Sequence, residues 1–435
     1  MPGLRAVTTL RAGCARLDIT PEWPLPLAGF ASRTGLSEGI ASPLHLRVVL
    51  LESRTGDTTA RAVIVSADIL WWAPELVAGY QDKLARLVGA PGQNVVLAAT
   101  HNHSGPQTSG RFAPSLGLPD PRFTSLLENA LLRAVASAEA ALEPVTVRRC
   151  RGAHHLGVHR RAWIDGEFQL APNPDGPSDP ELTVVAFERV DGSPHSLLVH
   201  YACHPVISSA NLISGEYPGA AMRALEERTD AVSLYLQGCS GDINPAGREW
   251  SRFASGGEDE ITRCGLALAD RVQELRAAHG EHLAPVPIRS ESRDLPLLFE
   301  VTPTDGEIVA ASMRPGVDGE WGRALLEDAS LRQPSTMLAM RRLDIADQLS
   351  LLTMNAEMVV EYGLFAKVIS AGKALPVSCC NGMIGYLPTA AQIAEGGYEP
   401  DGSTRYFLLP SRFSPAIEDD VKRAIERLTS DRATR

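Results

Sequence analysis

Two closely spaced histidines form the clearest chemical signal in the sequence. The apolar run Val95–Ala99 leads through Thr100 into His101 and His103, and a Gly/Pro turn follows them. In an extended chain, residues i and i+2 point the same way, so we expect both imidazoles on one side of a strand end. Such a pair can place one imidazole on a metal ion and the other beside it as a proton-transfer group. Two surface histidines at a strand exit are the competing interpretation.

A third histidine follows another apolar run. His204 comes shortly after Leu197–His200 and directly before Pro205, where a strand is expected to end. Strand ends are the usual positions of site residues in α/β proteins, although a histidine before proline can also be a turn residue. His200 lies inside the run and is expected to be a core histidine.

A Gly/Asp segment follows the apolar run Val232–Leu236. Gly238 and Gly241 would let backbone amides approach a ligand closely, and Asp242 could orient a metal-bound histidine. A tight turn is the competing interpretation. Ser240 could be a nucleophile, but it lacks the last glycine of the G-x-S-x-G pattern, so we disfavour a serine mechanism there.

The elements that must position these residues alternate between strands and helices. This alternation predicts an α/β fold with layered mixed sheets flanked by helices, and we expect one domain over residues 1–435. The expected strands are Leu46–Leu51, Ala62–Val65, Asn94–Ala98, Leu182–Phe187, Leu197–His200, Val232–Leu236 and Leu351–Met354. The expected helices are Pro74–Leu87, Pro121–Leu142, Ala220–Glu227, Asp259–Ala278 and Ser414–Leu428. The Pro/Gly/Asp-rich stretches Ala171–Pro180, Pro303–Pro315 and Gly396–Ser403 are expected to be loops.

Composition narrows the class of protein. A net charge of −11 argues against a nucleic-acid partner, which would favour a basic face. No apolar run is long enough to span a membrane, and residues 1–20 lack the apolar core of a secretory signal. The seven cysteines are an odd number without CxxC pairing, and we expect reduced thiols, with Cys379 and Cys380 buried. We therefore predict a soluble cytoplasmic protein, in an oligomeric state that the sequence does not define.

Several motifs follow one another along the chain. They begin with Gly13–Pro21, which contains Asp-Ile-Thr-Pro, and a Gly-Phe turn at Gly29. They continue with Thr100–Pro106, Leu212–Glu216 and Gln237–Ala246. In this order they resemble the catalytic domain of the neutral/alkaline (non-lysosomal) ceramidase family, which has Asp where this chain has Glu216. The matches extend from about residue 12 to about residue 400, nearly the whole chain, so the resemblance implies the fold of that catalytic domain.

The resemblance also implies one zinc ion per chain. Its ligands, carried over by position, are His101, His204, Glu357 and Tyr386, with Glu361 as the alternative glutamate. Two imidazoles and a carboxylate leave zinc Lewis-acidic, with room for a water of lowered pKa.

Three further residues are carried over as parts of the active site. His103 takes the position of the non-ligand histidine, Arg160 that of a substrate-facing arginine, and Tyr398 that of a second tyrosine twelve residues after Tyr386. We expect zinc-activated water to attack an amide carbonyl and His103 to carry the proton toward the leaving nitrogen. Arg160 and Tyr398 would then orient the substrate or stabilise the oxyanion.

The chain departs from the family pattern in three respects. Asn244 stands where the family has its active-site serine, so a covalent serine mechanism is excluded there, although the amide could donate a hydrogen bond to an oxyanion. The chain ends shortly after Tyr398, so we expect no C-terminal β-sandwich domain, and we find no export signal. These departures favour a small soluble amide, such as an N-acylated amine of a biosynthetic or catabolic pathway, over a lipid.

Other functions remain open at this level. A zinc-dependent esterase or lactonase would use the same residues, and a binding protein could keep the fold without turnover. A two-metal phosphatase would need more bridging Asp or Asn ligands than the sequence offers.

Overall fold

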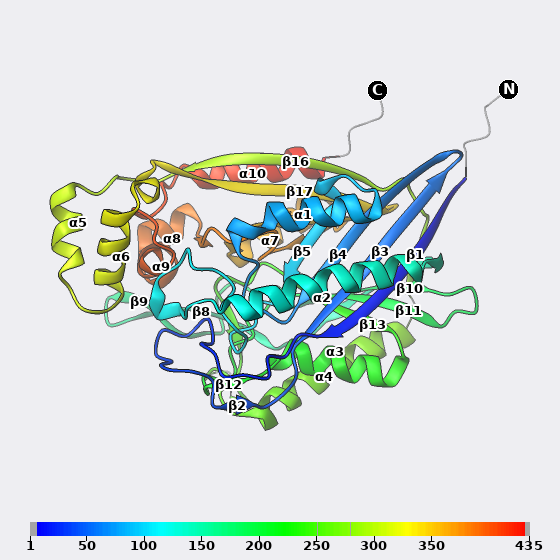
Figure 1. The fold of residues 1–435 in the computed structure, drawn as a ribbon, viewed down its shortest axis with the longest axis horizontal. Helices are drawn as coiled ribbons and strands as arrows, with labels where there is room; N and C mark the ends of the chain where they lie inside the picture. The colour runs from blue at the N-terminus through cyan, green and yellow to red at the C-terminus, as the bar shows by residue number, and fades with distance from the viewer. Residues whose placement is uncertain (1–6, 250, 279, 431–435) are drawn as a thin grey trace.

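The computed structural model describes residues 7–249, 251–278 and 280–430, and it stacks two β-sheets between two layers of helices (Figure 1). The first sheet has the order β5-β4-β3-β1-β6, and α1 and α2 cover its outer face. Its strands are β1 (Thr8–Asp18), β3 (His45–Thr55), β4 (Thr58–Ala67), β5 (Val95–Ala99) and β6 (Glu143–Pro144), and its helices are α1 (Pro74–Val88) and α2 (Pro121–Ala140). The layered α/β prediction is therefore confirmed.

The second sheet has the order β13-β11-β10-β7-β15, and α3 and α4 cover its outer face. Its strands are β7 (Thr146–Ala153), β10 (Glu181–Glu188), β11 (Pro194–Tyr201), β13 (Val232–Gln237) and β15 (Glu281–Leu283). The helices are α3 (Glu216–Thr229) and α4 (Glu258–Ala277). A buried apolar layer lies between the two sheets and continues onto a third sheet.

The third sheet has the order β16-β17-β18-β20 and packs against α7 and α10. It consists of β16 (Arg289–Leu298), β17 (Ser335–Ala346), β18 (Leu349–Met354) and β20 (Ala374–Val377), with α7 (Val360–Ile369) and α10 (Ile417–Thr429). Smaller elements complete the described fold. They are β2 (Gly39–Ile40), β8 (Gly157–Ile164), β9 (Glu167–Asn173), β12 (Leu212–Ile213), β14 (Ile243–Pro245), β19 (Glu357–Met358), β21 (Tyr386–Leu387), α5 (Asp305–Ser312), α6 (Gly316–Glu327), α8 (Ala390–Glu395), the π-helix η4 (Tyr398–Gly402) and α9 (Ser403–Tyr406), besides short 3₁₀ turns.

Strand β3 shows why the apolar runs are nearly continuous. Val48 and Leu50 pack toward α1 and α2, whereas Val49 and Leu51 pack into the layer between the sheets. Side chains of a strand alternate between its faces, so a strand covered on both faces needs apolar residues at every position.

Each of the three sheets contains one parallel strand pair next to the candidate site. The pairs are β4–β5, β11–β13 and β18–β20. Backbone hydrogen bonds join their carboxyl ends: the Ser378 amide donates to the Gln237 carbonyl at 2.9 Å, and the Ala99 amide donates to the Cys379 carbonyl at 3.2 Å. The residues that follow these strands are therefore held together at one point.

Two of the expected loops contain helices. The stretch Pro303–Pro315 includes α5, whose capping box joins Thr304 and Glu307, and Gly396–Ser403 includes the π-helix η4. The expected loop Ala171–Pro180 overlaps the end of β9. The loop prediction was therefore wrong for Pro303–Pro315 and Gly396–Ser403. Pro and Gly at the ends of these stretches are typical of loops, but here they flank short helices.

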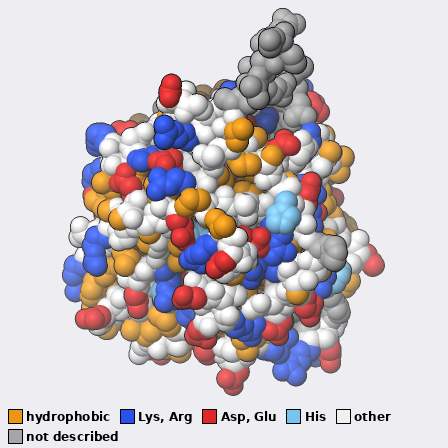
Figure 2. Space-filling view, turned by 90° about the vertical axis from the view of Figure 1, so that its right-hand side faces the viewer, with side chains coloured by type: hydrophobic (Ala, Val, Ile, Leu, Met, Phe, Trp, Pro, Cys, Tyr) orange, Lys and Arg blue, Asp and Glu red, His pale blue; other side chains and the backbone are white. Residues whose placement is uncertain are grey.

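Within the described ranges, no helix is both long and apolar enough to cross a membrane. On the face shown in Figure 2, basic and acidic side chains are interspersed, and hydrophobic ones lie scattered among them. The predictions of one domain and of a cytoplasmic location stay predictions.

Candidate metal centre

His101 leaves the strand ladder in a left-handed turn. It has φ +64°, which is uncommon for a residue other than glycine, and only Thr100 separates it from the end of β5. The expectation that His101 and His103 continue an extended strand is therefore wrong. The imidazoles nevertheless meet, because the turn brings Nε2 of His103 to 3.4 Å from Nε2 of His101.

Three side chains converge from the carboxyl ends of the three parallel pairs. Nε2 of His101 lies 3.1 Å from Nε2 of His204, and Oε2 of Glu357 lies 3.1 Å and 3.2 Å from these two nitrogens. The hydroxyl of Tyr386 lies 3.5 Å from Nε2 of His204. All four residues are at most 5% exposed, so little of the cluster faces bulk water.

Backbone carbonyls fix the orientation of both histidines. Nδ1 of His101 lies 3.0 Å from the carbonyl oxygen of Leu70, and Nδ1 of His204 lies 2.6 Å from that of Ser240. A carbonyl can only accept, so each Nδ1 carries a proton, and in the neutral imidazole the lone pair is therefore on Nε2. Two lone pairs and a carboxylate oxygen therefore face one another.

This arrangement fits a tetrahedral cation. Zinc bonds of about 2.0–2.1 Å place neighbouring ligand atoms about 3.3 Å apart, close to the separations in the cluster. Facing lone pairs repel one another, so these atoms need a positive charge between them, which either a metal ion or a proton on His101 can supply. The residues present thus suit zinc, with Nε2 of His101 and His204, Oε2 of Glu357 and the hydroxyl of Tyr386 as its possible ligand atoms.

The electrostatics of the cluster favour positive charge near Glu357. Burial and the charge of Arg160 lower the pKa of His204 to about 4, which keeps this imidazole neutral. Burial opposes ionisation of Glu357, but His101 and His204 hold its pKa well below the usual value. Burial also opposes charging of His101, whereas Cys379 and Glu357 raise its pKa well above the usual value. Burial and the neighbouring imidazoles lower the pKa of His103 well below its usual value.

Arg160 contacts several of the other residues near the cluster. Its Nε donates to Glu399 at 2.8 Å, its Nη1 donates to the side-chain oxygen of Asn244 at 3.2 Å, and its guanidinium lies over the rings of Tyr386 and Tyr398 at 5.3 Å and 5.6 Å. Because both tyrosines touch one guanidinium, the structure brings Arg160, Tyr398 and Asn244 beside the cluster.

The roles predicted for Asp242 and Glu361 do not match their contacts, and the motif residue Glu216 also has another partner. Asp242 pairs with His159 at 3.2 Å and accepts from the amide of Val360, so it orients neither cluster histidine. Glu216 accepts from the amide of Ser208 at the start of α3. Glu361, the alternative ligand, accepts from Gln392 on α8.

The glycines of the Gly/Asp segment also serve another purpose than expected. A Cβ on Gly238 would lie 2.8 Å from the Ala202 side chain, and one on Gly241 would lie 3.0 Å from the Glu357 carbonyl oxygen. They make room for neighbouring parts of the chain, not for a ligand.

Several residues of the site were not predicted from the sequence. Leu70 and Ser240 contact the histidines through their backbone carbonyl oxygens. Every residue has such an oxygen, so the type of side chain does not reveal this role. Cys379 was expected to be buried, as it is, but its influence on His101 was not foreseen. Glu399, directly after Tyr398, belongs to no motif in the sequence, and only the structure shows that its buried carboxylate binds Arg160 and Arg161.

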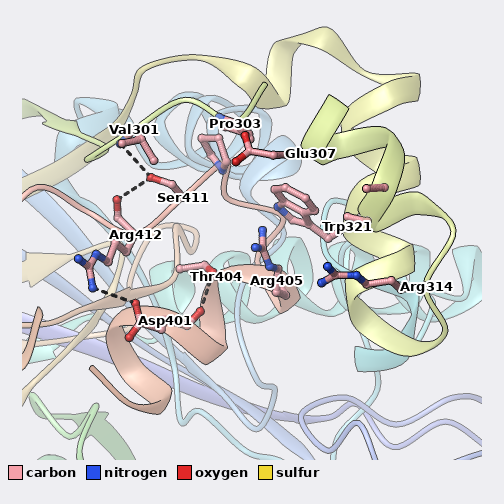
Figure 3. A pocket seen from close by; sticks show the side chains of 13 residues that line it. Val301, Pro303, Glu307, Arg314, Trp321, Asp401, Thr404, Arg405, Ser411 and Arg412 are labelled. Carbon is pink, nitrogen blue, oxygen red and sulfur yellow. Dashed lines mark hydrogen bonds and ion pairs between the residues drawn. The ribbon is translucent and has the colours of Figure 1, made fainter. Parts of the chain in front are cut away.

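A separate cavity of about 410 Å³ lies between α5, α6 and the segment that follows Tyr398 (Figure 3). Trp321 and Arg405 stack at 3.7 Å on its wall. None of the eight predicted site residues lines it.

These features define a layered α/β protein with a buried His/His/Glu/Tyr site of metal-ligand type. Residues 10–246, more than half of the chain, match the neutral/alkaline non-lysosomal ceramidase family (N-terminal part). The chain therefore belongs to this family.

Individual relatives agree with this assignment. The chain is 25% identical to neutral ceramidase B of Dictyostelium discoideum over 260 residues, which are 55% of this chain and 36% of that protein. It is 26% identical to neutral ceramidase of Pseudomonas aeruginosa over 263 residues, 56% of this chain and 38% of that protein. The matches thus span little more than a third of the length of these curated relatives.

Solved structures show the same fold over a longer stretch. A crystal structure of neutral ceramidase from Pseudomonas aeruginosa aligns with a TM-score of 0.73 and 18% identity, covering 97% of this chain and 74% of that one. A ceramidase complexed with C2 aligns with a TM-score of 0.75, also at 18% identity, covering 97% and 75%. This likeness extends through the third sheet, beyond the residues of the sequence match.

Proposed function

We propose that this protein is a zinc-dependent hydrolase that cleaves an amide-type C–N bond of a small soluble molecule in the cytoplasm. The observation that carries the proposal is the meeting of two Nε2 lone pairs and one carboxylate oxygen, from His101, His204 and Glu357, at 3.1–3.2 Å. Membership of the ceramidase family supports the choice of amide chemistry.

Zinc at this position would supply Lewis acidity, which would polarise a carbonyl oxygen and lower the pKa of water toward neutrality. His101, His204, Glu357 and Tyr386 are its proposed ligands. The carbonyls of Leu70 and Ser240 hold the two imidazoles in the tautomer that ligation needs.

The proposed roles of the surrounding residues follow from their positions. His103 is next to His101 and carries a proton toward the leaving nitrogen. Arg160 and Tyr398 orient the acyl group and stabilise the negative charge that develops on its oxygen. Asn244 keeps Arg160 in place through its side-chain oxygen and cannot act as a covalent nucleophile.

Hydrolysis of N-acylated amines tests the proposal. The purified protein, loaded with zinc, should release amine from at least one member of a panel of small N-acyl amides. A chelator should abolish the release, and added zinc should restore it. Matched esters in the same panel separate an amidase from an esterase or lactonase. Zinc-loaded protein that turns over neither amides nor esters would favour a binding protein, and preferential turnover of ceramide would contradict the soluble substrate.

A further inference from the structure

The segment that contains Phe30 and Arg33 packs directly against His103. The ring of Phe30 meets the His103 imidazole edge to face with centroids 5.2 Å apart. Gly29 has φ +98°, and a Cβ there would lie 2.4 Å from Nδ1 of His103, so only glycine allows this approach. The backbone and Arg33 are thereby fixed beside the residue proposed to transfer the proton.

One edge of the Arg33 guanidinium has no partner. Its Nη1 donates to the carbonyl oxygens of His103 at 2.8 Å and Ala28 at 3.1 Å, and the guanidinium lies 5.0 Å from the centroid of the Phe30 ring. Its Nε and Nη2 atoms are buried and make no hydrogen bond to the described residues. These two N–H groups form the edge that binds a carboxylate with two parallel hydrogen bonds.

Arg33 also lacks a counter-ion among the described residues. Burial lowers the pKa of Arg33 to about 10, and Glu216 only partly opposes this effect from a distance. Other arginines near the site are paired: Arg160 and Arg161 both bind Glu399. Arg33 is only partly buried, but two of its nitrogen atoms are shielded from water and unpaired, which is costly and calls for a missing partner.

The arginines at the cavity of Figure 3 provide a contrast. Arg314 and Arg405 lie 3.6 Å and 3.5 Å from Asp318, and Arg412 lies 3.4 Å from Asp401. Each of these arginines has a carboxylate within 3.6 Å, and Arg314 and Arg405 share one, so in contrast to Arg33 none of them lacks a counter-ion.

We propose that Arg33 binds a carboxylate of the substrate, which makes the substrate an N-acylated amino acid. The inference rests on the proposed amidase function. Arg33 holds the main chain of His103, and His103 protonates the leaving nitrogen, so the carboxylate belongs to the amine half of the substrate. Water adds its hydroxyl to the acyl carbon, the C–N bond breaks and the nitrogen gains a proton, which yields a carboxylic acid and a free amino acid.

Matched substrate pairs test this specificity. In each pair, the zinc-loaded full chain is given an N-acetylated amino acid and the analogue that lacks only the carboxylate, for example N-acetylphenylalanine and N-acetylphenethylamine. We expect Arg33→Met to lower kcat/KM for the carboxylate substrate about 10- to 100-fold and for its neutral partner about threefold or less. Arg33→Lys keeps the charge but not the two-point edge, and it should fall between wild type and Arg33→Met.

Controls separate recognition from folding. Arg122 also stacks on an aromatic ring, that of Trp23, but pairs with Asp120, so Arg122→Met should leave both activities unchanged. Melting curves of both variants identify any loss of fold. Equal hydrolysis of the two substrates by wild type, or an equal loss on both in Arg33→Met, would overturn the assignment.

A binding experiment distinguishes failure of the carboxylate site from failure of the amidase proposal. If the zinc-loaded protein hydrolyses no amide, calorimetry with N-acetylphenylalanine still tests Arg33. Binding that Arg33→Met weakens at least about tenfold supports the carboxylate site, and binding that is absent or equal in both proteins overturns it.

Discussion

At the scale of single residues, the site depends on groups of two kinds. Side chains supply the candidate ligand atoms, whereas backbone carbonyls of Leu70 and Ser240 determine which nitrogen of each histidine is free. A histidine whose Nδ1–H is held in this way is a better-oriented ligand than one with a freely rotating ring. The motif around His101 therefore determines that the ligand is an imidazole, and the fold determines that its Nδ1 carries the proton and its Nε2 is available to a metal ion.

The two tyrosines should differ in what they contribute. Tyr386 lies at ligand distance from the cluster, so Tyr386→Phe should weaken zinc binding and lower activity. Tyr398 touches Arg160 but is not among the proposed ligands, so Tyr398→Phe should lower kcat by about 10²-fold and leave zinc affinity unchanged. Zinc titration and steady-state kinetics on both variants check this difference. An unchanged zinc affinity in Tyr386→Phe would remove that residue from the ligand set.

At the scale of elements, the site depends on close packing where strands end. The amide of Gly241 donates to the Met358 carbonyl at 2.8 Å, which ties the segment after β13 to β19, the strand that carries Glu357. This contact leaves no space for a side chain at position 241.

Gly241→Ala should therefore damage stability and metal binding together. The added methyl group would push against the backbone oxygen of Glu357, and we expect a loss of about 1–3 kcal/mol in the free energy of unfolding. Zinc affinity should fall about tenfold. Gly306→Ala on α5 is the matched control, since nothing lies near its Cβ position. Urea unfolding and zinc titration measure both effects, and equal behaviour of the two variants would contradict this account of the packing.

A buried ion pair should make stability depend on pH. His159 on β8 pairs with Asp242, which also accepts from Val360 on α7. Burial opposes charging of His159, but Asp242 raises its pKa above the usual value. A raised pKa in the folded state adds stability that is complete below about pH 6.5, the value of an unfolded histidine, and is lost as the pH rises through the folded pKa.

Removing the histidine should flatten this dependence. Between pH 6 and pH 9, wild type should lose more unfolding free energy than His159→Gln, as measured by urea unfolding at each pH. The comparison is one of slopes, so a general loss of stability in the variant does not affect it. Parallel curves for the two proteins would show that the pair does not govern the pH response.

The sequence could predict the central strands but not the way they converge. Runs such as Val95–Ala99 are apolar at every position because both faces are covered, so their strand character is readable. The third sheet was mostly missed, since β16 and the outer part of β17 are half exposed and carry charged residues. The periodicity of apolar residues shows which face of a helix or strand is buried, but not which other elements it packs against. Short helices such as α5 and single turns such as that at His101 depend on those neighbours and were therefore missed.

The residues of the candidate site could be predicted mainly from the order of the family-like motifs in the sequence. The eight carried-over residues lie close together, although they come from segments between positions 101 and 398. Arg33 has no motif of its own. Its relevance depends on the missing counter-ion, which only the packed structure reveals.

At the scale of the whole molecule, the candidate metal centre lies where three sheets meet. His101 follows a strand of the first sheet, His204 one of the second, and Glu357 one of the third. A bound cation would therefore hold together three parts of the fold that otherwise meet through apolar layers and a few backbone hydrogen bonds. Zinc should accordingly raise the melting temperature of the protein.

The most direct test of the account is the zinc content of the protein purified without chelators, compared with that of two ligand variants. We predict about one zinc per chain in wild type, and loss of that zinc in both His101→Ala and Glu357→Ala. His155→Ala, which changes an exposed histidine outside the cluster, should keep the metal. Wild-type protein without zinc, or full occupancy in both ligand variants, would contradict the central claim that these side chains form a zinc site.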